Sequence, residues 1–593
     1  MKLPSVLNLV TVFIEILKRY PLVMASAAVG SFSMSYLIEH EGVEIHHTIK
    51  LIFTAALGIP LFLSAALLSR RWARGGWVRL APHLLALTVL VLFYATFRVF
   101  QYNSPAPSSL LVFFLLNIAA HLAVSVIPWV GRGAEGSFWE YNKTLLLNLA
   151  VGVLYSGVVY AGLSIAIAAM NELFELKIDG SIYGHLFFFI GSIFTTSWFL
   201  AHFPEREVEQ GQMEVSQLPL LHILVKYILI PIVTIYMVIL YAYSAKIIVH
   251  WELPRGWVAS LVLGFSVAGI LTWLLNHQER IFDKGVVMDY FHRWYFPVLL
   301  PMTALLFVAI GRRISDYGVT EMRYVVAITG VWLLVSCLYF IFAKKVDIRF
   351  IPLSLIVVAL LTAVGPLSAR SVSTRSQIHR LEKLLAQANM LEEGKIVAFS
   401  DSSKIEQALE IRNIFQYLRD WNKLSLVAHM HDAIPADGKM SYEEWDAFMT
   451  SLKLPASKES GTPEIYCNYN FEQPASFSTS GPSTVYIVNL SPEDLTSESN
   501  AAVRVEGDTI VVQDSVAGSW VLPLNDYLDS LRNDYGCSPP NVLPPEAGEF
   551  RWRFDSVGFK LMLRNLNVKL EFEDPRPRLE YANGFLLLER IEQ

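Results

Sequence analysis

The chain has 593 residues, of which 53% are hydrophobic and only 17% are charged, whereas ordinary soluble domains carry roughly 25% charged residues. The formal net charge of −6 divides unevenly: 22 Lys/Arg stand against 33 Asp/Glu after Leu367, so that part is about −11 and the part before it about +5. This composition excludes a wholly water-soluble protein, and the acidic C-terminal part argues against nucleic acid as a partner.

Residues 1–20 predict an amphipathic helix that lies on the membrane surface. A lysine before an apolar run is typical of a signal peptide, but Glu15 and Lys18-Arg19 interrupt the run and no small-residue cleavage site follows directly. We therefore expect this segment to be retained as an interfacial helix.

Residues 21–367 predict an all-α polytopic bundle of about 11 transmembrane helices, because a spanning helix needs about 20 mostly apolar residues. The apolar segments are 21–38, 49–68, 80–97, 108–128, 144–171, 183–203, 219–246, 255–275, 294–311, 323–343 and 348–367. An odd number of spans places the two ends of the chain on opposite sides of the membrane. Ten or twelve spans would move the C-terminal part to the other side.

The distribution of basic residues predicts the orientation, because Lys and Arg are held back on the cytoplasmic side during insertion. With the N-terminus inside, seventeen Lys/Arg lie at inner loops and eight at outer loops. The contrast is sharpest between the basic stretch 70–79 and the acidic turn 39–44. The sequence thus predicts a cytoplasmic N-terminus and a C-terminal part outside the cytoplasm.

The part after Leu367 divides into a soluble helical segment, 368–455, and a soluble α+β domain, 456–593. Helical periodicity covers 375–391 and 402–426, and Ser441 with Glu444 forms a capping-box pattern. In the second domain an alternating pattern predicts strands at 484–490, 503–513, 550–555, 560–572 and 579–591. The dipeptide Asn583-Gly584 predicts a hairpin turn inside the last of these.

The three cysteines have different settings. Cys337 lies in an apolar segment and is expected to be a small buried hydrophobic residue. Cys467 and Cys537 lie in the C-terminal domain, where they form either one disulfide, if that domain is outside the cytoplasm, or two free thiols.

Polar residues inside apolar segments are the candidate sites of the membrane part, because such groups are costly in lipid. Asn117 and His121 lie one turn apart in mid-segment, and a buried hydrogen-bonded pair is the simpler interpretation than a proton relay. Lys226 precedes Pro231, which can kink or break the long helix 219–246. Together these four residues predict a polar site near the middle of the membrane.

Chemical motifs are scarce. Glu172, Glu175 and Asp179 form an acidic group in one outer loop, for which a hydrated loop is the simpler account. The pair His429 and His431 has no further ligand nearby, which weakens a metal interpretation. The chain has no Walker A loop, G-x-S-x-G, H-E-x-x-H or Rossmann glycine pattern. We predict no catalytic, cofactor-binding or metal residues.

Four stretches carry a family resemblance: 155–162 (YSGVVYAG), 173–179 (LFELKID), 226–231 (KYILIP) and 251–258 (WELPRGWV). They resemble a bacterial membrane family that is frequent in Bacteroidetes and is known as a domain of unknown function, DUF4153. The resemblance implies a location in the inner membrane of a Gram-negative cell, which makes the outer compartment the periplasm. It implies no activity.

Three hypotheses about function follow. The first is an envelope scaffold, sensor or accessory subunit that contacts membrane lipid and binds envelope proteins through residues 368–593. The second is a transporter or lipid-handling protein with a mid-membrane cavity near Lys226, Pro231 and His121. The third is an enzyme acting on a lipid-linked substrate.

Overall fold

The computed structural model describes residues 6–590 except 41–44, 73–75, 99, 102–103, 106, 132, 251–256, 284, 393, 401–403, 455–464, 472–482, 491–502, 507–508, 515–517, 525–526, 529, 532–533, 535–542, 555–556 and 571–576. The chain forms two compact units. The helical unit comprises Met1–Val397 and Ile414–Phe448, and the C-terminal unit comprises Ala398–Asn413 and Met449–Gln593.

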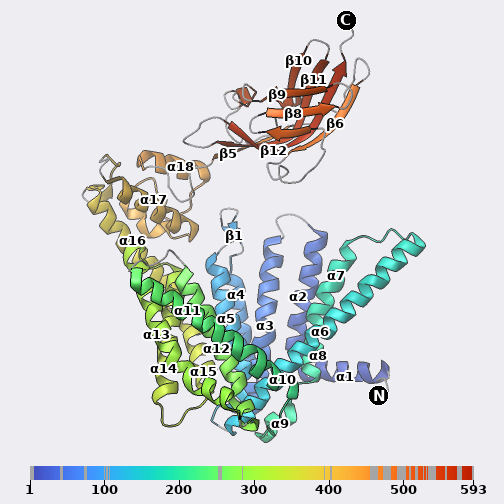
Figure 1. Cartoon of the computed structure of the whole chain (residues 1–593), viewed down its shortest axis with the longest axis vertical. Helices are drawn as coiled ribbons and strands as arrows, with labels where there is room; N and C mark the ends of the chain where they lie inside the picture. Colours follow the sequence, from blue (N-terminus) through green and yellow to red (C-terminus); the bar gives the residue numbers. More distant parts are fainter. Residues whose placement is uncertain are drawn as a thin grey trace. The chain divides into compact units, whose positions relative to one another are not determined.

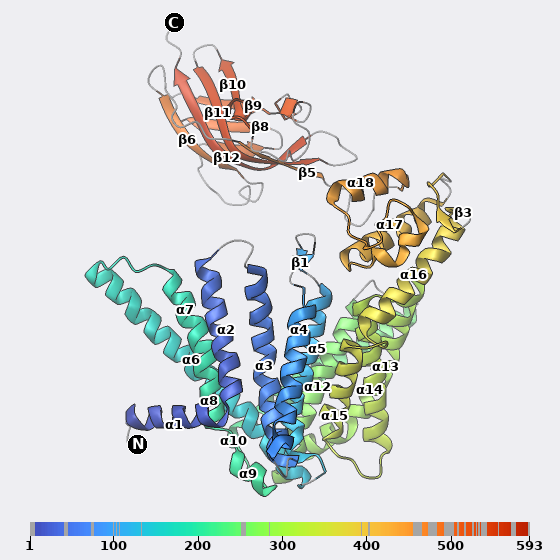
Figure 2. The ribbon, with the colours of Figure 1, turned by 180° about the vertical axis from the view of Figure 1, so that it is seen from behind.

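The helical unit is a bundle of long apolar helices (Figures 1 and 2). Its helices are α1 (Val6–Arg19), α2 (Pro21–Glu39), α3 (Ile45–Trp72), α4 (Ala81–Thr96), α5 (Pro107–Val126), α6 (Glu135–Phe174), α7 (Ser181–Phe189), α8 (Thr195–Ala201), α9 (Glu205–Gln210), α10 (Pro219–Ile223), α11 (Ile230–His250), α12 (Trp257–Phe282), α13 (Val286–Tyr317), α14 (Glu321–Phe342) and α15 (Phe350–Ala363).

The predicted membrane fold class is confirmed. Within the described residues, ten helices are long and apolar enough to cross a membrane, and α15 is a shorter apolar helix of 14 residues. Each of the eleven apolar segments of the sequence coincides with one of these spans. At about 1.5 Å per residue, α15 is about 21 Å long, which is less than the roughly 30 Å of a bilayer core.

Two spans contain a π-helical turn. Residues Ile190–Phe194 join α7 to α8, and residues Leu224–Leu229 join α10 to α11. The second turn directly precedes Pro231, which has no N–H to donate to the turn before it. Such π turns occur frequently at functional sites.

Small residues bring neighbouring helices into close contact. A Cβ atom added at Gly152 of α6 would lie 2.8 Å from Cδ1 of Trp198 on α8, whereas one added at Gly157 would meet nothing within 4 Å. The hydroxyl groups of Ser156 and Thr195 are 2.6 Å apart in the same contact. Close approach of this kind is how helices pack where lipid supplies no hydrophobic driving force.

Three helices follow the membrane bundle. They are α16 (Ala369–Gln387), α17 (Ile405–Asp420) and α18 (Tyr442–Ser451), with a 3₁₀ segment at Leu424–Met430 and a small hairpin of β3 (Leu391–Glu392) and β4 (Lys395–Ile396). Helix α16 lies within the helical unit, while the boundary between the two units falls inside α17 and α18. The Tyr417 hydroxyl donates to Glu321 at 2.5 Å, which ties α17 to the start of α14. The Ser441–Glu444 capping box is confirmed, since each residue's backbone N–H donates to the other's side chain.

The C-terminal unit contains two antiparallel sheets. Its strands are β5 (Ile465–Asn470), β6 (Ser483–Leu490), β7 (Val503–Glu506), β8 (Thr509–Asp514), β9 (Gly518–Pro523), β10 (Glu549–Phe554), β11 (Val557–Leu570) and β12 (Pro577–Arg590). In one sheet β11 pairs with β12 along one edge and with β10 and β5 along the other, and β6 follows β12. Strands β7, β8 and β9 form the second sheet, and residues of both sheets share one hydrophobic core.

The hairpin predicted at Asn583-Gly584 is wrong. Strand β12 runs through both residues and pairs on one side with β6 and on the other with β11. Gly584 is required there for another reason: an added Cβ atom would lie 2.1 Å from the carbonyl oxygen of Met562. A β-bulge occurs at this point, between Leu563 and Asn565, and glycine in a strand often marks such close backbone approach.

Candidate functional site

One end of the bundle is formed by residues 70–72, 76–80, 129–131, 133–135, 201–218, 282–283, 285–286 and 343–349, and we call it the basic end. It lies at the foot of the bundle in Figure 1. Arginines hold its loops together. Arg71 donates to the carbonyls of Ile127 and Val130, and Arg349 pairs with Asp347 at 2.8 Å and donates to the carbonyl of Trp129 at 3.1 Å.

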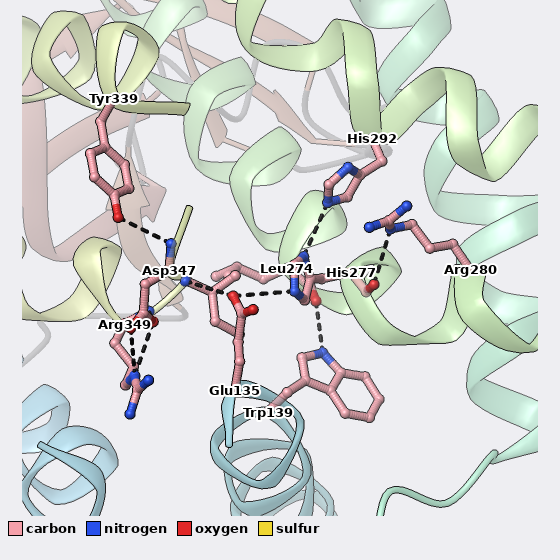
Figure 3. Close-up of polar contacts among 10 residues, drawn as sticks. Glu135, Trp139, Leu274, His277, Arg280, His292, Tyr339, Asp347 and Arg349 are labelled. Atoms are coloured by element: carbon pink, nitrogen blue, oxygen red, sulfur yellow. Dashed lines mark hydrogen bonds and ion pairs between the residues drawn. The ribbon is translucent and has the colours of Figure 1, made fainter. Parts of the chain in front are cut away.

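A chain of one carboxylate and two imidazoles crosses this end (Figure 3). Glu135, the first residue of α6, accepts the backbone N–H of Ile348 at 2.9 Å and lies 3.4 Å from Nε2 of His277 on α12. Nδ1 of His277 lies 3.0 Å from Nε2 of His292 on α13. With both rings neutral, His292 donates to His277 and His277 donates to Glu135, so a single tautomer satisfies every contact in the chain.

Indole groups fix this chain in place. The Trp139 indole N–H donates to the carbonyl of Leu274 at 2.8 Å and so ties α6 to α12. The Trp273 indole N–H donates to the carbonyl of His292 at 2.9 Å, and its ring stacks on the imidazole with centroids 4.6 Å apart. The arrangement joins α6, α12, α13 and the α14–α15 connection.

A buried ion pair lies two turns further along α6 than Glu135. Lys143 and Glu140 are 2.8 Å apart, with side chains 4% and 7% exposed. Ser216 completes the contact: its N–H and hydroxyl donate to the Glu140 carboxylate, and its carbonyl accepts from Lys143 at 2.6 Å. The carboxylate of Glu140 and the ammonium group of Lys143 therefore both have hydrogen-bond and charge partners.

A second acid–base group lies beside it, between α12 and the start of the α10–α11 span. Lys226 pairs with Asp283 at 2.5 Å, and His222 lies 3.2 Å from Asp283 and 3.8 Å from Glu279. The hydrogen bond from Lys226 lowers the pKa of Asp283, which lies in the turn after α12. Glu279 is fully buried.

A cavity of about 510 Å³ adjoins these polar groups. It lies between α5, α6, α12, α14 and α15, and its walls are mostly apolar. Trp139, Lys143, Leu274 and Ile348 belong both to the cavity wall and to the contacts described above. The cavity is thus an almost wholly apolar space, and part of its wall is formed by residues that also make the polar contacts.

The four residues of the predicted mid-membrane site lie on two spans, Asn117 and His121 on α5 and Lys226 and Pro231 in the α10–α11 span. His121 is exposed on α5, and its Nδ1 lies 2.9 Å from the backbone carbonyl of Asn117. Pro231 is exposed at the start of α11. Among the four, Lys226 belongs to a polar cluster within the described residues, through Asp283.

The acidic outer group lies at the turn between α6 and α7. Glu172, Glu175 and Asp179 are all exposed, and Asp179 accepts the backbone N–H of Ser181, the first residue of α7, at 2.7 Å. Cys337 is fully buried, as predicted. Cys537 and the side chain of Cys467 lie outside the described residues, so their disulfide stays a prediction.

Sequence reasoning missed the residues at the basic end. The apolar windows began at 144 and ended at 275, which left Glu135–Lys143 and Asn276–Asp283 outside the predicted spans. One signal was available: Glu135, Trp139 and Lys143 recur at intervals of four, which places them on one helix face. Their partners lie far away in the sequence, so the cluster itself is a product of packing.

Comparisons with known proteins give a family without an assigned activity. An uncharacterized protein of Pasteurella multocida (strain Pm70) is 23% identical over 425 residues, which cover 70% of this chain and 68% of the relative. No solved structure matches the chain. The family model described as "Domain of unknown function (DUF4153)" matches residues 24–393, which is more than half of the chain, and the chain belongs to this family.

Proposed function

We propose that this membrane protein handles lipids and that its cavity holds a membrane amphiphile, with an acyl chain along the apolar walls and a polar group at the end near Lys143. The observation that carries the proposal is an apolar cavity of about 510 Å³ whose wall includes residues of a polar cluster. Ligand sites are typically concave, mostly apolar and equipped with a few placed polar groups. Between the helices of a membrane bundle, the most abundant ligand of that description is lipid.

The position of the cavity supports this choice over a hydrophilic solute. Its polar lining consists of Ser125, Asn142, Lys143, Ser266 and Thr329, and the other lining residues are apolar apart from the Trp139 and Trp332 indole groups. Among the wall residues, the side chains of Leu146, Val267 and Leu271 are 54%, 61% and 57% exposed on the bundle surface. An acyl chain can therefore enter sideways from the bilayer.

The polar end offers hydrogen bonds rather than net charge. Lys143 is neutralised by Glu140, and Asn142 is hydrogen-bonded to Ser125 at 2.5 Å. A zwitterionic or hydroxyl-bearing head group fits such an end better than a strongly anionic one, because a second anion would compete with Glu140 for the same ammonium group.

The test measures bound lipid in the purified full chain. Native mass spectrometry and lipid extraction would compare the wild type with Leu146→Trp and Thr329→Leu. Each replacement puts a larger side chain on the cavity wall, one on α6 and one on α14, and so reduces the space for a lipid. Leu149→Trp, on an exposed face of α6 outside the cavity, is the matched control. We expect about one retained lipid per wild-type or control chain and a several-fold loss in both cavity variants. Equal lipid content in all four proteins would contradict the proposal.

We further propose that the basic end faces the cytoplasm of a Gram-negative cell and that the chain lies in the inner membrane, with the C-terminal unit in the periplasm. The excess of Lys and Arg at the inner loops supports this orientation. A reporter that is active only outside the cytoplasm, fused after Ser371, should be active. An inactive reporter, with an active control fusion within 174–181, would contradict the orientation of the C-terminal part.

A scaffold role remains the second proposal. The C-terminal unit has a hydrophobic core of its own, as expected of an independent binding module. In this proposal, envelope proteins bind to residues 368–593. Cross-linking in cells and purification of the full chain should recover a partner joined to that region. Recovery of cross-links only to lipid-facing helices would contradict it.

A further inference from the structure

Glu279 is a buried acid whose charge is not compensated by hydrogen bonds. It lies in the last turn of α12 and is fully inaccessible to solvent. Within the described part of the chain, neither of its carboxyl oxygens has a hydrogen-bond partner. The backbone N–H of Leu218 faces it but lies outside hydrogen-bond geometry. The C-terminal end of a helix also disfavours a negative charge.

Charged groups from three elements surround Glu279. Glu140 and Lys143 face it from α6, and His222 faces it from α10 with Nδ1 3.8 Å from Oε2. Asp283 follows α12 and contacts both His222 and Lys226. Arg280, the next residue along α12, points away toward Asp289 and the carbonyl of His277.

The charges of this group balance only if it binds one proton. Glu140, Glu279 and Asp283 supply three carboxyl groups, and Lys143 and Lys226 supply two ammonium groups. With all three carboxyl groups deprotonated, these five residues carry one net negative charge around the buried Glu279, and an uncompensated buried charge is costly. Glu140 and Asp283 both make short hydrogen bonds to a lysine or a serine, so the proton belongs at Glu279 or at its neighbour His222.

We propose that Glu279 and His222 form a proton-binding site that holds one exchangeable proton between them. In one form Glu279 is a neutral carboxylic acid beside a neutral imidazole. In the other the imidazolium of His222 donates from Nε2 to Asp283 and from Nδ1 toward Glu279. Conversion breaks the Nδ1–H bond and forms an O–H bond at Oε2, and it requires the two atoms to approach by roughly 1 Å.

The site is open to the protein surface at the basic end. The side chains of Asp283 and Lys226 are 18% and 23% exposed, whereas Glu279 is not exposed at all. His222 thus lies between the solvated carboxylate and the buried one. The site also adjoins two other features: Lys226 belongs to the π turn Leu224–Leu229, and Lys143 lines the cavity. The proton site stands without the proposed lipid binding, and its test does not involve lipid.

The experiment is pH-difference infrared spectroscopy of the full chain in nanodiscs, in H₂O and D₂O. The wild type should show a protonated carboxyl band that is absent from Glu279→Gln and retained in Glu135→Gln, whose side chain belongs to the separate imidazole chain. In His222→Gln the same band should be stronger than in the wild type, because the imidazole no longer competes with Glu279 for the proton.

Each alternative outcome overturns the proposal. A wild-type spectrum without a band assignable to Glu279 means that the carboxylate stays ionised. Glutamine imitates the neutral acid, so Glu279→Gln should fold and elute like the wild type. Failure of Glu279→Gln to fold, when Glu279→Asp folds, would show that the negative charge is required.

Discussion

Replacing Lys143 by Met tests the buried ion pair that forms the polar end of the cavity. The change leaves Glu140 buried without its cation, and breaking a buried pair in this way costs about 3–5 kcal/mol. We expect the lower limit, about 3 kcal/mol, because Ser216 still donates two hydrogen bonds to the Glu140 carboxylate.

The expected change in melting temperature follows from the size of the unit. With an unfolding entropy of about 2.1 cal/mol/K per residue, the melting temperature of a unit of roughly 430 residues falls by about 1 °C for each kcal/mol of lost unfolding free energy. Lys143→Met should therefore lower the Tm by about 3 °C, measured by tryptophan fluorescence on the full chain in one detergent. The paired variant Glu140→Gln/Lys143→Met should recover much of the loss, because Gln is neutral and can donate to the Ser216 carbonyl. A single variant within about 1 °C of the wild type, or a paired variant less stable than the single one, would refute this reasoning.

Two further predictions concern packing and pH. Gly152→Ala should lower the free energy of unfolding by about 1–3 kcal/mol, since its methyl group would lie 2.8 Å from the Trp198 ring. Gly157→Ala on the same helix should have no effect in the same thermal assay. Equal effects of the two substitutions would contradict the α6–α8 contact. Burial lowers the pKa of His431, and its Nδ1 accepts the N–H of Ala433 at 3.1 Å. The folded chain therefore binds fewer protons at this residue than the unfolded chain below about pH 6.5, so stability should fall as the pH falls. His431→Gln should reduce the drop in Tm between pH 7.5 and 5.5, while the exposed His429→Gln should leave it unchanged; an unchanged drop in His431→Gln would contradict the assignment.

The spans were predictable because a long apolar window has few alternatives. The alternating pattern predicted the strands β6, β7, β8, β10, β11 and β12 of the C-terminal unit, whereas β5 and β9 were not predicted. The Asn583-Gly584 error shows the limit of local signals: glycine serves a tight turn and a close contact between strands equally well, and only the paired strands β11 and β6 decide between them.

The candidate site was not predictable, since charged residues at the ends of apolar windows are ordinarily exposed to solvent. Glu135 and Lys143 precede one window, and Glu279 and Asp283 follow another. Their positions in the cluster arise from tertiary contacts such as that between Glu135 and Ile348, which are 213 positions apart. In contrast, the polar residues within windows, Asn117 and His121, contact each other along α5, so local spacing alone accounts for their pairing.

The central claim is that the space between α5, α6, α12, α14 and α15 holds a lipid. An experimental density map of the full chain in native-lipid nanodiscs tests it most directly. The account predicts elongated density between these helices, with its broader end beside Lys143 and Asn142. An empty cavity, or one filled by rearranged side chains of the walls, would contradict it.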